Sequence, residues 1–103
     1  MGQEVHTKAV DSFFDAILTL ESKDEYYSFF EDICTVKELL SLAQRFEVAK
    51  MLREGKTYIT IAKKTGASTA TISRVNRALN YGTEGINLVL DRMEEQTGNS
   101  AKE

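Results

Sequence analysis

Apolar residues recur at every third or fourth position through most of this sequence, which is the spacing of helices with one apolar face. The clearest run predicts a helix from about Thr7 to Glu21 and consists of Val10, Phe13, Phe14, Ile17 and Leu18. The chain contains no proline, and its six glycines mostly fall between such runs. Proline and glycine are the residues that most disfavour helix interiors. The sequence therefore predicts an all-α fold rather than a strand-rich sandwich.

Two capping boxes divide the first half of the chain into three helices. Ser22 with Glu25, and Thr35 with Glu38, have the spacing at which a hydroxyl and a carboxylate each accept a backbone N–H at a helix start. The second helix carries its apolar residues at helical spacing, at Tyr26, Phe29, Phe30 and Ile33. The third is expected to continue to about Arg53, where a glycine soon follows and ends it.

Three more helices are predicted in the second half. Thr57 and Ser68 can cap the fourth and fifth helices, and Gly66 and Gly82 can end them. Five apolar residues indicate a sixth helix: Ile86, Leu88, Val89, Leu90 and Met93. The last residues, 96–103, have no apolar anchor and are expected to form a mobile tail.

The third predicted helix is apolar on too many sides for a surface helix. Its apolar residues are Val36, Leu39, Leu40, Leu42, Ala43, Phe46, Val48, Ala49, Met51 and Leu52. A helix that is apolar nearly all round is normally buried nearly all round, and a chain of 103 residues has few elements with which to cover it. The pattern favours a homodimer formed through residues 1–55. The alternative is a monomer in which this helix is the centre of the core.

The composition argues against several kinds of site. One cysteine, Cys34, and one histidine, His6, exclude an intramolecular disulfide and leave too few ligands for a structural zinc site. They also favour a reducing, cytoplasmic setting. No apolar run approaches the roughly 20 residues of a membrane span, and no nucleophile motif or phosphate-binding glycine loop occurs. We therefore expect no membrane association, no catalytic residues, no metal and no cofactor.

Residues 58–77, with the sequence YITIAKKTGASTATISRVNR, have the pattern of a helix-turn-helix. Ala62 is small where the two helices would pass closest, and Gly66 supplies the positive φ that a sharp turn requires. The residues expected to point into the core are Ile61, Ile72, Val75 and Leu79. The residues left on the outer face of the second helix are small at its N-terminal end, namely Ser68, Thr69, Ala70 and Ser73, and basic farther along, namely Arg74 and Arg77. This arrangement is typical of a recognition helix, which enters the major groove of double-stranded DNA by its N-terminus.

Charge is divided unevenly along the chain. The net charge is −3 at pH 7, yet residues 55–83 contain five bases and no acid, whereas residues 1–54 and 84–103 are both net acidic. The positive charge therefore coincides with the helix-turn-helix, where Lys63, Lys64 and Arg77 are candidates for phosphate contacts. The alternatives are a structural helix pair with a solvated basic face, and a protein–protein interaction module with an acidic partner.

Two stretches resemble the tryptophan repressor superfamily. KMLREGKTYITIAKKTGASTATISRVNRALN is similar to its helix-turn-helix core, and GASTATISRVNRAL is similar to its recognition helix. With the front half FFDAILTLESKDEYYSFFEDICTVKELLSLAQRFEVAKML, the resemblance to the YerC/YecD-like branch extends from about Ser12 to Met93. It implies a six-helix subunit whose N-terminal helices interlock with those of a partner, in a homodimer that binds a two-fold operator. It also implies that Thr69, Ala70 and Ser73 read base edges.

The known repressor of this superfamily uses L-tryptophan as corepressor, and three of the four matching positions of this chain depart from its pocket. Arg74 matches the pocket's arginine. Val75 replaces a glycine that makes room for the indole, Ala78 replaces a serine that receives the amino group, and Gln44, next to Arg45, replaces an arginine that holds the carboxylate. The resemblance thus implies a degenerate corepressor pocket, and we expect DNA binding without tryptophan. An amino-acid-responsive repressor with an altered pocket is the alternative, and the sequence identifies no effector.

Taken together, these patterns predict one domain with four segments. They are a helical dimerisation half (residues 1–55), a helix-turn-helix (56–82), a C-terminal helix (83–95) and the mobile tail (96–103).

Overall fold

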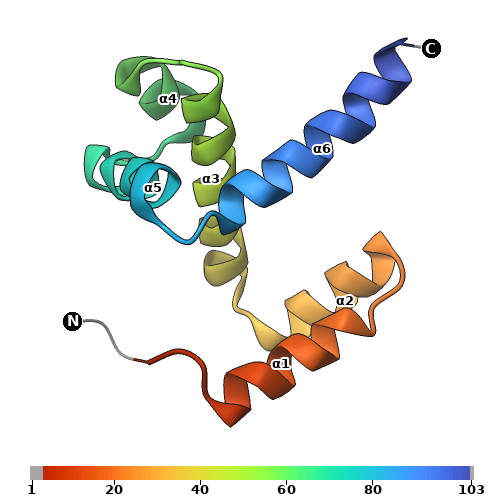
Figure 1. Ribbon diagram of the computed structural model, residues 1–103. Helices are drawn as coiled ribbons and strands as arrows, with labels where there is room; N and C mark the ends of the chain where they lie inside the picture. Colours follow the sequence, from red (N-terminus) through yellow and green to blue (C-terminus); the bar gives the residue numbers. More distant parts are fainter. Residues whose placement is uncertain (1–3, 103) are drawn as a thin grey trace. The chain divides into compact units, whose positions relative to one another are not determined.

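The computed structural model describes residues 4–102, which form six helices and no strand (Figure 1). The helices are α1 (Lys8–Leu18), α2 (Lys23–Ile33), α3 (Val36–Arg53), α4 (Tyr58–Thr65), α5 (Thr69–Tyr81) and α6 (Gly85–Lys102). The all-α fold and the six predicted helices are confirmed.

One predicted capping box forms in full and the other in part. At the start of α3, the Glu38 N–H donates to Thr35 Oγ1 at 3.0 Å and the Thr35 N–H donates to Glu38 Oε1 at 2.8 Å. At the start of α2, the Glu25 N–H donates to Ser22 Oγ at 3.2 Å, but Glu25 Oε1 accepts from the N–H of Glu21, one residue earlier than in the standard box. These local bonds satisfy N–H groups that a helix start otherwise leaves without a partner.

The chain divides into two compact units at a boundary inside α3, between Leu39 and Leu40. In the first unit, α1 and α2 pack through aromatic residues, with the ring centroids of Phe13 and Phe29 5.9 Å apart. No residue of α1 or α2 is buried. The first compact unit ends at Leu39, whereas the dimerisation half expected from the sequence extends to residue 55.

The hydrophobic core lies in the second unit. Its buried residues are Val48, Ala49, Met51, Ile61, Ala67, Ile72, Val75, Leu79 and Leu90. The second half of α3 supplies the first three of these, which explains why the unit boundary falls within that helix. All four core positions predicted for the helix-turn-helix are buried.

The last helix is longer than its sequence pattern indicates. α6 continues to Lys102, whereas the expected helix ends at residue 95. Adding residues to an existing helix is far easier than starting one, so this extension does not require apolar anchors. The expected mobility of residues 96–103 stays a prediction. Within residues 4–102, no helix combines the length and the apolar character needed to cross a membrane.

Candidate nucleic-acid interface

The helices α4 and α5 contact each other and are joined by a sharp turn. Gly66 has φ 75°, in the left-handed region, and its N–H donates to the Ala62 carbonyl. Ala67, a residue of the turn, is buried, and Ser68 Oγ accepts from the Thr71 N–H at the start of α5. The predicted left-handed glycine and both predicted caps are present, so the local geometry is that of a helix-turn-helix.

A side chain from α3 braces this turn. Gln44 Nε2 donates to the Thr65 carbonyl at 3.1 Å, and that carbonyl belongs to the last residue of α4. Thr65 Oγ1 donates to the Ile61 carbonyl and accepts from the Ala67 N–H. The turn is therefore tied both to its own helix and to α3. Sequence reasoning assigned Gln44 to a ligand pocket and missed this role.

The candidate DNA-contacting residues lie mainly on the surface of the second unit. Seven of them are exposed: Lys63, Lys64, Ser68, Thr69, Ala70, Arg74 and Arg77. Ser73 is partly buried, which leaves less of its side chain available to a partner. In the part of the chain that the structure describes, the ion pairs involve Lys50 and Arg53 and none of the four bases of this set. Their charges are thus not neutralised by carboxylates of the described residues.

A cavity of about 360 Å³ lies beside the recognition helix α5. Its lining is Leu42, Arg45, Phe46, Arg74, Val75, Ala78 and Ile86, which come from α3, α5 and α6. Arg74, Val75 and Ala78, three of the four positions of the expected degenerate pocket, line this cavity together with Arg45. Gln44 is not part of this lining, because its amide is engaged at the turn. Val75 is only 5% exposed and belongs to the core, so its side chain fills space at the cavity wall.

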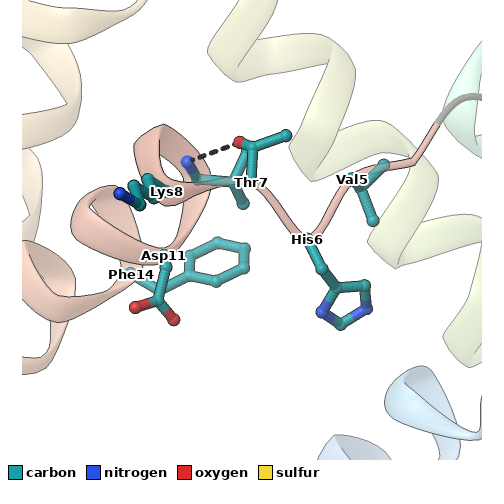
Figure 2. Close-up of a pocket in the computed structure, with 7 residues that line it drawn as sticks. Val5, His6, Thr7, Lys8, Asp11 and Phe14 are labelled. Atoms are coloured by element: carbon teal, nitrogen blue, oxygen red, sulfur yellow. Dashed lines mark hydrogen bonds between the residues drawn. The ribbon is translucent and has the colours of Figure 1, made fainter.

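A second hollow, of about 460 Å³, lies at the start of α1, and Figure 2 shows its lining residues. The dashed line in Figure 2 is the bond from the Val10 N–H to Thr7 Oγ1, which caps α1. His6, Lys8 and Asp11 also line it, and all three are exposed. The hollow is formed by one short segment, and no buried polar group is directed into it. It therefore lacks the features of a ligand-binding site. The described residues contain no group of three metal-ligating side chains.

Comparisons with known proteins agree with this geometry. The family described as Trp repressor protein matches residues 8–94. The "Uncharacterized protein YerC" of Bacillus subtilis (strain 168) is 55% identical over 96 residues, which cover 92% of each chain.

Two solved structures are also similar. A TrpR-like protein from Eubacterium eligens ATCC 27750 is 64% identical with a TM-score of 0.84, over 86% of this chain and 92% of that one. A putative Trp repressor from Staphylococcus aureus is 55% identical with a TM-score of 0.83, over 86% of this chain and 89% of that one. The resemblance drawn from the sequence is confirmed, and the chain belongs to the Trp repressor protein family.

Proposed function

We propose that this protein is a sequence-specific, repressor-like transcriptional regulator, acting in the cytoplasm and without catalytic activity. The observation that carries the proposal is the helix-turn-helix itself. It is built on a left-handed glycine, it contains bases and no acid, and its exposed bases are not paired with carboxylates of the described chain. A concentration of unpaired positive charge on one structural unit is the electrostatic signature of a surface that binds phosphates.

The N-terminal turn of α5 is suited to the major groove. Ser68, Thr69 and Ala70 are small and exposed, so the helix backbone can approach base edges closely, and a methyl or hydroxyl group can contact them. Arg77 lies farther along the exposed face of α5, and Lys64 lies in the last turn of α4. We assign these two to phosphates, which fix the position of a protein on DNA without reading its sequence.

We also propose that the protein is a homodimer that binds a two-fold operator. Support comes from large apolar side chains that a single chain leaves exposed, including Leu18 (80%), Val36 (77%) and Leu40 (63%). Large apolar surface left exposed by one chain is typical of a protein–protein interface. A second copy of the chain exposes the same apolar residues, so two copies can cover these residues for each other.

The phosphate assignment predicts a change in salt dependence. Arg77→Ala and Lys64→Ala should each weaken binding to every duplex and, because a dimer loses two contacts, reduce the slope of log affinity against log salt by about 2. Lys50→Ala is the matched control, because Lys50 lies on α3 and is paired with Glu47 at 3.2 Å. The measurement is fluorescence anisotropy of labelled duplex at several salt concentrations. Slopes that are unchanged in both variants, or no duplex binding by the wild type at low salt, would contradict the proposal; the second result favours an interaction module.

The cavity beside α5 supports a second candidate, a repressor that responds to a different amino acid. Arg45 and Arg74 both line this cavity among apolar residues, and guanidinium groups can hold a carboxylate. Val75 makes the wall bulkier than a glycine would. We therefore expect no heat in calorimetry with L-tryptophan, and a smaller amino acid is the ligand this cavity would accept. Saturable heat with tryptophan would refute the degenerate-pocket assignment.

A further inference from the structure

The guanidinium group of Arg53, the last residue of α3, bonds to groups on α6. Its Nη1 donates to the carbonyl and to Oδ1 of Asn87, both at 3.2 Å. Its Nη2 lies 2.8 Å from Asp91 Oδ1 and 3.2 Å from Glu94 Oε2. The arginine side chain is 24% exposed, so these bonds are partly shielded from water. Arg53 therefore holds the Asn87 amide in one orientation.

The other end of the Asn87 amide bonds to the recognition helix. Its Nδ2 donates to the Leu79 carbonyl at 3.0 Å and to Glu84 Oε1 at 3.2 Å. Leu79 lies in the last turn of α5, where helix carbonyls have no partner within the helix. One amide thus connects the end of α3, the start of α6 and the C-terminal end of α5.

The turn between α5 and α6 is tightly built as well. Glu84 has φ 71°, a left-handed conformation that is unfavourable for a residue other than glycine. Gly82 caps the end of α5, and a Cβ there would lie 2.4 Å from the Ala78 carbonyl oxygen of the same helix, so no side chain fits at this position. Strained backbone of this kind persists where surrounding contacts enforce it.

We propose that Asn87, oriented by Arg53, is a positioning residue that sets the direction of the recognition helix on DNA. The inference rests on the proposed function. The apolar core also holds α5, but apolar contact has no preferred direction, whereas the Asn87 bond does. A helix of 13 residues is about 20 Å long. A tilt of about 3° at its C-terminal end therefore moves its N-terminal turn by about 1 Å, which exceeds the tolerance of a hydrogen bond to a base.

The expected consequence is a loss of specificity with little loss of general affinity. Contacts from Ser68 and Thr69 to base edges require exact placement, whereas flexible lysine and arginine side chains can follow a phosphate through a small shift. A merely structural role would lower the folded fraction and would reduce binding to all duplexes by the same factor. The ratio of specific to non-specific affinity separates the two roles.

The experiment compares Asn87→Ala and Asn87→Asp with wild type, and uses Lys50→Ala as the control. An aspartate at this position keeps the oxygens that face Arg53 but cannot donate to the Leu79 carbonyl. Affinities are measured for the duplex selected by wild type and for a scrambled duplex, at a temperature where every variant is folded. We expect both Asn87 variants to lose about tenfold in specific affinity, with unchanged non-specific affinity and salt slope. A ratio equal to that of wild type in both variants would overturn the proposal.

Residual dipolar couplings of the free protein give a second readout that needs no DNA. The direction of α5 relative to the second half of α3 should change in Asn87→Ala and stay unchanged in Lys50→Ala. An unchanged direction in Asn87→Ala would overturn the positioning role. If wild type selects no duplex, the proposed function fails, and the couplings still decide whether Asn87 orients α5.

Discussion

Replacing Ile72 by alanine is expected to lower the free energy of unfolding by about 2–5 kcal/mol. Ile72 lies in α5 with none of its surface exposed, and it is among the largest fully buried side chains, with Ile61 and Val48. The loss has two parts, the transfer free energy of the deleted carbons and the cost of the cavity that remains. The recognition helix depends on this anchor because its opposite face is exposed.

Ile59→Ala is the matched control for this experiment. Ile59 belongs to α4 and is 73% exposed, so the same chemical change should alter the free energy of unfolding by no more than about 0.5 kcal/mol. Urea denaturation at one fixed protein concentration compares the two variants, since the stability of a dimer depends on concentration. Equal losses in the two variants would contradict the core described for the second unit.

The second prediction concerns the mass of the protein in solution. Light scattering at micromolar concentration should report about twice the chain mass of 11.6 kDa. Leu40→Glu should shift the mass toward that of one chain, because it places a charge on an apolar residue that is 63% exposed in a single chain and that a partner would bury.

Ile59→Glu places the same charge on an exposed apolar residue of α4, outside the predicted dimerisation half, and should leave the mass unchanged. A wild-type mass near 11.6 kDa would contradict the homodimer. A dimer that both glutamate variants leave intact would show that the contact does not involve α3 at Leu40.

The parts of the fold that depend on local sequence were predictable. The Thr35–Glu38 capping box and the left-handed Gly66 follow from residue type and spacing, because their partners lie within a few residues. Burial of Ile61 and Ile72 follows from helical periodicity. The exposure of Lys63 follows from the same periodicity, because residues between the apolar positions of a helix lie on its outer face.

The contacts that sequence reasoning missed join residues far apart in the chain. Gln44 and Thr65 are 21 positions apart, and Arg53 and Asn87 are 34 apart. No local pattern marks such a pair, because the partner is set by how the helices pack. Alignment by position placed Gln44 in the ligand pocket, and only the packing of α3 against the turn shows where its amide is bonded. Ser73 was expected on the outer face and is partly buried, since it lies at the border between the two faces of α5.

Selection of bound sequences from a pool of random duplexes tests DNA binding by the helix-turn-helix, its sequence specificity and the homodimer in one experiment. The account predicts enrichment of a site with two-fold symmetry. The centres of its half-sites should be separated by one helical turn of DNA, about 34 Å, or by a multiple of that distance. Binding to that site should weaken steeply as salt increases. A pool without enrichment, or an enriched site without two-fold symmetry, would contradict the account.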